Sequence, residues 1–152
     1  MRCRIGAFLL LLVLLGSAAG AADHRQLFAD AGAGDPEACY TLAHLYLAGR
    51  GGLEPDQRQG RLWLQRAALL GQPEAPFELA QLFLEDQPVS EQDYQHALFW
   101  LEYGAQRSHT EAQYVLGSIH AGKQPDIALR WLHRAARAGH QKAQQKYTEL
   151  CA

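Results

Sequence analysis

Apolar residues recur along this chain at the spacing that buries one face of an α helix. From residue 38 they stand at positions i, i+4, i+7 and i+8, and the series returns from residue 75. A second stripe runs through "DYQHALFWLEYGA". The first stripe contains Ala38, Leu42, Leu45 and Tyr46, and the second contains Ala97, Trp100, Leu101 and Ala105. These stripes predict paired amphipathic helices, in which small Ala allows close approach and Trp fills the space between helices.

One segment of the chain occurs three times in related forms. "LWLQRAALLGQPEA" from Leu62 returns as "FWLEYGAQRSHTEA" from Phe99 and as "RWLHRAARAGHQKA" from Arg130. The copies share Trp-Leu at the second and third places and Ala at the seventh and fourteenth. The successive alanines from Ala38 to Ala143 are 37, 37 and 31 residues apart, and a shorter loop absorbs the difference. Such a period predicts helix pairs that stack into a solenoid, because one pair cannot bury its apolar face alone.

The ends of the expected helices carry residues with known local preferences. Asp35, Pro36 and Glu37 supply a capping side chain, a proline for the first helical position and an acid for the first turn. Gly71 and Gly139 are expected to end second helices. The predicted divisions are a capping segment 22–34 with a short helix from Leu27 to Gly34, units at about 35–71, 72–108 and 109–139, and a C-terminal cap helix 140–152.

The repeated pattern resembles a known family. The first unit reads "ACYTLAHLYLAGRGGLEPDQRQGRLWLQRAALLG", and this is similar to the Sel-one-like repeats, relatives of the tetratricopeptide repeats, with Gly60 where the family prefers Ala. The resemblance extends from about Ala33 to Ala152. It implies an all-α, right-handed superhelical solenoid of antiparallel helix pairs, three repeats long with helical caps. For function it implies a scaffold that binds other proteins and that bacteria often export.

The first residues predict export. Arg2 and Arg4 precede the uncharged run from Ile5 to Leu15, and small residues follow it. This order is typical of a secretory signal peptide, here residues 1–21, with cleavage after Ala21 or Ala22. The run is short for a membrane span, which needs roughly 20 apolar residues, although a retained anchor stays an open alternative. We expect a periplasmic or secreted monomer with no stable membrane insertion after cleavage.

Charge and cysteine content narrow the possible partners. The formal net charge of −2 gives no indication of a nucleic-acid partner. The charges are nonetheless uneven, since residues 74–111 are mainly acidic and residues 112–152 mainly basic.

After loss of Cys3, only Cys39 and Cys151 remain, too few for a disulfide framework. Because stacked pairs lie roughly 10 Å apart, these two cysteines are expected to be too distant for a bridge, with Cys39 packed inside.

The histidines and serines do not form a pattern with recognisable chemistry. His109 and His140 fall at the junction position of Gln72 and are expected to be exposed, whereas His120 replaces an aromatic residue between helices. No H-x-x-x-H or C-x-x-C spacing indicates a metal site. Ser118 lacks the strand-turn-helix setting of a nucleophile elbow. We therefore predict no catalytic residue, no metal and no cofactor.

What remains as a candidate site is the side of each first helix opposite its core stripe. In a tetratricopeptide-like solenoid this side lines a concave groove, where the recurring Glu and aromatic could contact an extended segment or helix of a partner protein. The aromatic could instead pack on the next first helix. The candidate residues are Glu37, Tyr40, His44 and Leu47 in the first unit, Glu74, Phe77, Gln81 and Leu84 in the second, and Glu111, Tyr114, Ser118 and Ala121 in the third.

These observations favour a non-enzymatic protein–protein interaction module that holds a protein or peptide in the groove. One form of this hypothesis is an immunity-type inhibitor of a secreted toxin. Two alternatives stay open. The first is an enzyme or binding protein for cell-wall or β-lactam substrates, and the second is a scaffold for envelope assembly.

Overall fold

The computed structural model describes residues 24–85 and 88–152. The predicted signal peptide and its cleavage sites at Ala21 and Ala22 lie outside the described residues. The chain divides into two compact units, one ending at Leu70 and the other running from Gly71 to Ala152. Every regular element in the described ranges is helical. None of the helices in those ranges has the length and apolar character needed to cross a membrane.

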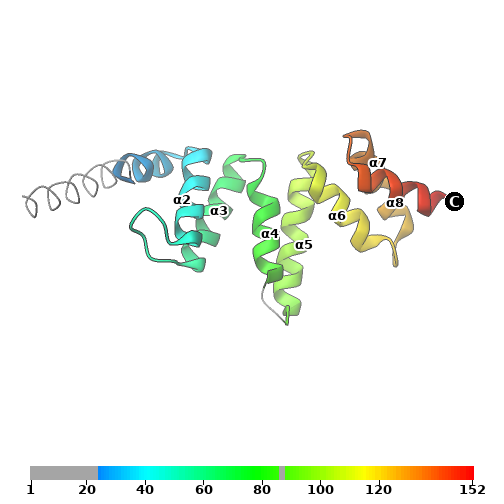
Figure 1. Ribbon diagram of the computed structural model, residues 1–152, viewed down its shortest axis with the longest axis horizontal. Helices are drawn as coiled ribbons and strands as arrows, with labels where there is room; N and C mark the ends of the chain where they lie inside the picture. Colours follow the sequence, from blue (N-terminus) through cyan, green and yellow to red (C-terminus); the bar gives the residue numbers. More distant parts are fainter. Residues whose placement is uncertain (1–23, 86–87) are drawn as a thin grey trace, which may run out of the picture. The chain divides into compact units, whose positions relative to one another are not determined.

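The first unit contains a helical stretch at 24–33 followed by the pair α2 (Pro36–Ala48) and α3 (Gln57–Leu70), which pack against each other (Figure 1). The core of this unit is formed by α2, α3 and the helical stretch before them, and it is made of small and branched apolar side chains. Its fully buried members are Ala31, Cys39, Leu42, Ala43, Leu64, Ala67 and Ala68.

The start of α2 is formed as the sequence predicts. The Asp35 carboxylate accepts a hydrogen bond from the backbone N–H of Ala38 at 2.7 Å, and Pro36 occupies the first turn. This arrangement satisfies one of the N–H groups that a helix leaves without an internal partner. At the other end Gly49 adopts a left-handed conformation with φ of 61°, which glycine reaches without steric cost.

Close contact between α2 and α3 explains the glycine at position 60. A Cβ atom at Gly60 would lie 2.5 Å from the side chain of Leu47 and 3.3 Å from the carbonyl oxygen of Ala43. The alanine that the repeat pattern prefers here would therefore overlap Leu47. This contact also corrects an expectation about Leu47, which packs against α3 instead of pointing away from the core.

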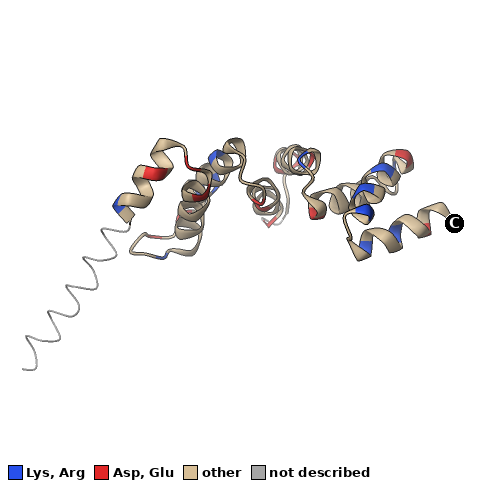
Figure 2. Ribbon diagram, turned by 90° about the horizontal axis from the view of Figure 1, so that it is seen from above, with Lys and Arg blue, Asp and Glu red and all other residues tan. Residues whose placement is uncertain are grey.

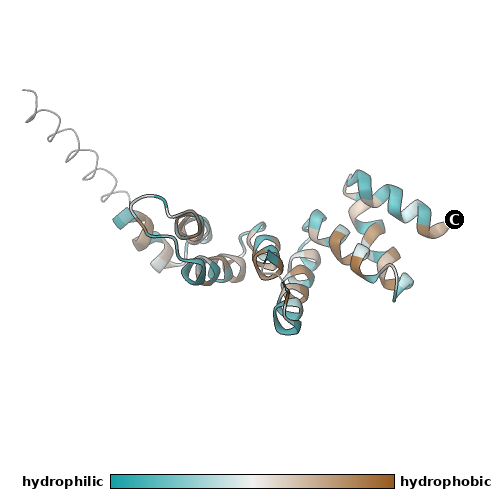
Figure 3. Cartoon of the chain, turned by 60° about the horizontal axis from the view of Figure 1, so that its bottom comes forward, coloured by the Kyte–Doolittle hydropathy of each residue, from teal (hydrophilic) through white to brown (hydrophobic). Residues whose placement is uncertain are grey.

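In its described residues the second unit contains five helices, and each packs on the next along the chain. They are α4 (Ala75–Glu85), α5 (Glu91–Gln106), α6 (Thr110–His120), α7 (Pro125–Arg137) and α8 (Gln141–Cys151). Both hydrophobic and hydrophilic residues are distributed along these helices in Figure 3, as their amphipathic sequences require. The segment predicted as a C-terminal cap contains a single helix, α8, which packs on α7.

The three repeated tryptophans do not have the same environment. Trp100 is 6% exposed and fills the space beside α5 as expected. Trp63 and Trp131 are only half-buried, and the guanidinium groups of Arg66 and Arg134 lie over their rings at 5.6 and 5.0 Å. The expectation that every Trp fills an interhelical space is therefore wrong for these two. The Leu after each Trp has that role instead, since Leu64, Leu101 and Leu132 are all buried.

The turns that follow the second helices share a left-handed residue at the same repeat position. Gly71 and Gly139 have φ of 100° and 92°, in agreement with the predicted helix ends. In the middle junction Ser108 takes this position with φ of 69°. A residue with a Cβ is strained there, because the Cβ approaches the following carbonyl oxygen.

Candidate protein-binding surface

Side chains cap the helices α4, α6 and α8 of the second unit. The Gln72 Oε1 accepts from the backbone N–H of Ala75 at 2.7 Å. At the next two junctions the Nδ1 atoms of His109 and His140 accept from the N–H groups of Ala112 and Ala143, at 3.2 and 3.1 Å. Both histidines are half-buried, so the expectation that they are exposed is wrong. They serve as helix caps.

Each of these histidines also stacks on the aromatic residue of the preceding first helix. The rings of Phe77 and His109 are 4.9 Å apart at 23°, and those of Tyr114 and His140 are 4.4 Å apart at 21°. Phe77 and Tyr114 therefore connect consecutive repeats, as the packing alternative for these residues predicts. Both aromatic residues remain half-buried, so part of each ring still faces solvent.

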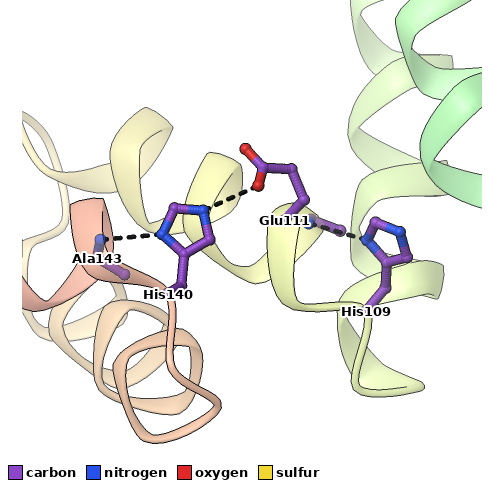
Figure 4. A network of polar contacts seen from close by, with 5 residues as sticks. His109, Glu111, His140 and Ala143 are labelled. Carbon is purple, nitrogen blue, oxygen red and sulfur yellow. Dashed lines mark hydrogen bonds and ion pairs between the residues drawn. The ribbon is translucent and has the colours of Figure 1, made fainter.

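The His140 cap is joined to the candidate surface through Glu111 (Figure 4). The Nδ1 of His140 accepts from the Ala143 N–H, so in the neutral ring the proton is carried by Nε2. This Nε2 lies 2.8 Å from Oε2 of Glu111 and donates to it. The His140 side chain is 13% exposed and that of Glu111 47%. At the earlier junction the Oε2 of Glu74 accepts instead from the Gln72 side-chain amide at 2.9 Å.

The electrostatic environment of His109 favours its neutral form. Burial of the ring lowers the pKa of His109 below its ordinary value of 6.5, and the nearby carboxylates Glu74, Glu111 and Glu78 oppose this shift only in part. The direction agrees with the geometry, because Nδ1 must be unprotonated to accept the hydrogen bond from Ala112.

A second recurring contact is a side-chain hydrogen bond from the first turn of one helix to a backbone carbonyl at the end of the preceding helix. The Sγ of Cys39 donates to the carbonyl oxygen of Ala31 at 3.6 Å. At the equivalent positions of the later repeats the Gln113 amide donates to Ala105 and the Gln144 amide donates to Ala136, at 3.0 and 3.2 Å. Each contact satisfies a carbonyl in a last helical turn. The buried free Cys39 thus occupies a structural position in which the third repeat and the C-terminal cap have glutamine, whereas the second repeat has Pro76.

The candidate binding residues fall into two groups by exposure. The exposed group is Glu37, His44, Glu74, Gln81 and Glu111, and the half-buried group is Tyr40, Leu47, Phe77, Leu84, Tyr114, Ser118 and Ala121. In the first unit the ring of His44 contacts the edge of Tyr40 at 4.5 Å. The Oγ of Ser118 is buried, so Ser118 does not present its hydroxyl to a partner as the outward-facing position suggests.

The structure also bears on the predictions about metal ligands and the two cysteines. Among the described residues no cluster of three His, Cys, Asp or Glu side chains could hold a metal ion. In the same ranges Cys39 and Cys151 are free, the first buried and the second exposed. The predicted burial of Cys39 is confirmed.

Antiparallel helix pairs with equivalent caps at successive junctions define a helical repeat protein. The family model for the Sel1 repeat matches residues 36–72, 73–109 and 110–140. The chain therefore belongs to the Sel1 repeat family, and the predicted all-α solenoid class is confirmed.

A solved structure supports the same assignment. The crystal structure of a Sel1 repeat protein from Oxalobacter formigenes is similar at 30% identity with a TM-score of 0.72, covering 84% of this chain and 98% of that one. The comparison with curated proteins gave no match. Sel1 repeats generally serve as protein–protein interaction modules, and this class of function applies to the chain.

Proposed function

We propose that this protein is exported and that it binds a partner protein, without catalysis, through the exposed side of its first helices. The observation that carries the proposal is that two neighbouring positions on α4 have different environments. Phe77 is engaged in stacking on His109, whereas Gln81, one turn further along, is exposed. The equivalent residues of the other units are His44, which is also exposed, and Ser118, whose hydroxyl is buried. The position thus differs from repeat to repeat and is exposed in the first two, while the capping contacts recur. Such variation suits residues that contact a partner.

The export part of the proposal rests on the basic and apolar sequence at residues 2–15. We further propose an immunity-type role, in which the module neutralises a secreted toxin by occupying one surface of it. Hydrolysis of a chromogenic β-lactam by purified protein would favour the enzymatic alternative instead. A constitutive multiprotein envelope complex would favour the scaffold.

A pair of matched variants tests the binding surface. Gln81→Arg places a long charged side chain on the exposed face of the first helix α4, and Gln65→Arg makes the same change on the exposed face of the second helix α3. Partners captured from a periplasmic extract are quantified by mass spectrometry with wild type and both variants. We expect a partner to be lost with Gln81→Arg and retained with Gln65→Arg, while circular dichroism stays helical. Equal capture by all three proteins would exclude this part of α4 from the binding surface.

A further inference from the structure

The exposed face of α7 carries three arginines at helical spacing. Arg130, Arg134 and Arg137 are four and three residues apart, which places them on one side of the helix, and all three are exposed. Blue Lys and Arg positions occur along the C-terminal helices in Figure 2. The other side of α7 is buried through Ala128, Leu132 and others. Within the described ranges none of the three guanidinium groups forms an ion pair with a carboxylate. This arginine stripe is therefore a positive surface, with Asp126, one turn before Arg130, as the acidic residue of the same helix.

Two hollows adjoin the stripe, and Arg134 lines both. The larger, of about 480 Å³, lies among the end of α5, the start of α6 and the end of α7. It is lined by Ala105, Gln106, Ser108, Gln113, Arg134, Arg137 and Ala138. The smaller, of about 200 Å³, is lined by Arg130, Trp131 and Arg134. The guanidinium carbon of Arg134 lies 5.0 Å from the centre of the Trp131 ring, which supports its position between the hollows.

We propose that the arginine stripe of α7 binds an acidic segment of a partner protein, with Asp or Glu carboxylates entering the larger hollow. A guanidinium group presents a planar set of donors that matches a carboxylate, and charged hydrogen bonds of this kind are stronger than neutral ones. Arg134 and Arg137 line one hollow together, so carboxylates of a single segment can pair with both. This site lies on a second helix and is separate from the proposed surface on the first helices.

An acidic protein segment fits this surface better than other anions do. Helices that bind membrane surfaces insert apolar side chains, but the large exposed apolar residues of the described chain do not include any on α7. Binding to nucleic acid draws on an extended positive field, whereas this chain has a net charge of −2. The positive charge is local to a hollowed face, which favours a short acidic segment.

The test uses a short fluorescein-labelled peptide of alternating Glu and Ser, with a peptide of alternating Gln and Ser as its neutral counterpart. Fluorescence anisotropy with the purified chain at low salt should show binding of the Glu peptide only. The double variant Arg134→Glu, Arg137→Glu should weaken binding by at least about tenfold, because attraction becomes repulsion. Arg58→Glu, at an exposed position of α3, reverses one charge where the double variant reverses two, and it should keep binding within about twofold of wild type.

Further measurements separate this proposal from its rivals. Gln81→Arg should leave peptide binding unchanged, so the failure of one proposed surface can be told from the failure of the other. Equal binding of the Glu and Gln peptides, no binding of the Glu peptide, or equal loss with Arg58→Glu would overturn the proposal. Tighter binding to phosphatidylglycerol vesicles or to single-stranded DNA than to the Glu peptide would overturn it as well. Circular dichroism of each variant verifies that it remains folded.

Discussion

At the scale of single residues, an acceptor atom placed three residues before a buried alanine caps α4, α6 and α8. Gln72, His109 and His140 supply this atom before Ala75, Ala112 and Ala143. The repeat alignment identifies the three positions as equivalent, but it does not predict their role. Capping is usually performed by Ser, Thr, Asp or Asn, and neither His nor Gln is among the preferred residues. Only the geometry shows that an imidazole nitrogen and an amide oxygen perform the same function.

The His109 cap predicts a stability that falls in mildly acidic solution. Burial lowers the pKa of His109 in the folded chain below the ordinary 6.5 of the unfolded chain. Between these two pKa values the unfolded chain binds the proton and the folded chain does not, so the free energy of unfolding decreases as the pH falls. The contribution is fully present above about pH 6.5 and is lost as the pH falls below that value towards the folded-state pKa.

The variant His109→Gln isolates this contribution, because Gln72 already performs the same capping with a group that does not titrate. Urea unfolding from pH 8 to pH 5 should show a variant that is somewhat less stable than wild type at pH 8, because it loses the stacking of His109 on Phe77. The decrease on acidification should be smaller in the variant. Parallel curves for the two proteins across this range would show that His109 does not contribute to the pH dependence.

A second residue-scale prediction concerns the left-handed turn after α5. Ser108 has φ of 69° where the other two junctions have glycine. Ser108→Gly should raise the free energy of unfolding by roughly 0.5–1 kcal/mol, since relief of the left-handed strain exceeds the extra entropy of glycine. Gly139→Ala is the matched control and should lower it by about 1 kcal/mol, because its Cβ meets no neighbour and only the backbone conformation opposes it. Urea unfolding with an unchanged m-value measures the change in the free energy of unfolding for both variants. A Ser108→Gly variant that is less stable than wild type would show that Ser108 is not strained.

At the scale of helices, small residues set how closely paired elements approach. The repeat places Ala43, Ala80 and Gly117 at one position, and only the third repeat has glycine there. A Cβ at Gly117 would lie 2.6 Å from Cγ of Leu132 and 3.1 Å from its backbone nitrogen. The sequence pattern predicts a small residue at this position, but it does not distinguish Ala from Gly. That distinction depends on an interhelical distance that no local sequence signal encodes.

The Gly117 contact can be tested against a glycine in a looser position of the same unit. Gly117→Ala should lower the free energy of unfolding by about 1–3 kcal/mol, because the added methyl group forces α6 and α7 apart. At Gly104 of α5 a Cβ would meet only ordinary contacts, the shortest at 3.4 Å to Pro76. Gly104→Ala should therefore be neutral or stabilising by up to about 1 kcal/mol through helix propensity. Thermal and urea unfolding measure the stability of both variants. Equal changes in the free energy of unfolding for Gly117→Ala and Gly104→Ala would show that α6 and α7 can move apart freely.

At the scale of the whole molecule, the repeat period predicts the helix order and the terminal cap, because each unit needs a neighbour to cover its apolar face. The division into two compact units after Leu70 could not be predicted. The junction "LWLQRAALLGQPEA" around it has the same Trp, Leu and Ala positions as the junctions inside the second unit. The sequence also does not predict the arginine stripe as a binding site. Its residues were visible as a basic C-terminal region, but the hollows beside them arise from the meeting of three helices.

The last prediction combines export with the state of the thiols. Cleavage after Ala21 or Ala22 would remove Cys3 and leave Cys39 and Cys151 in the mature chain. Cys39 is buried, and burial is the main cause that raises its pKa, whereas Cys151 is exposed. Because the thiolate is the reactive form, a maleimide should label Cys151 alone in the native, pre-reduced protein and both cysteines in denaturant. Intact-mass measurement reports the N-terminus and the number of adducts together. Three adducts on a chain that retains Met1 would contradict cleavage, and native labelling of Cys39 as fast as Cys151 would contradict its packed position.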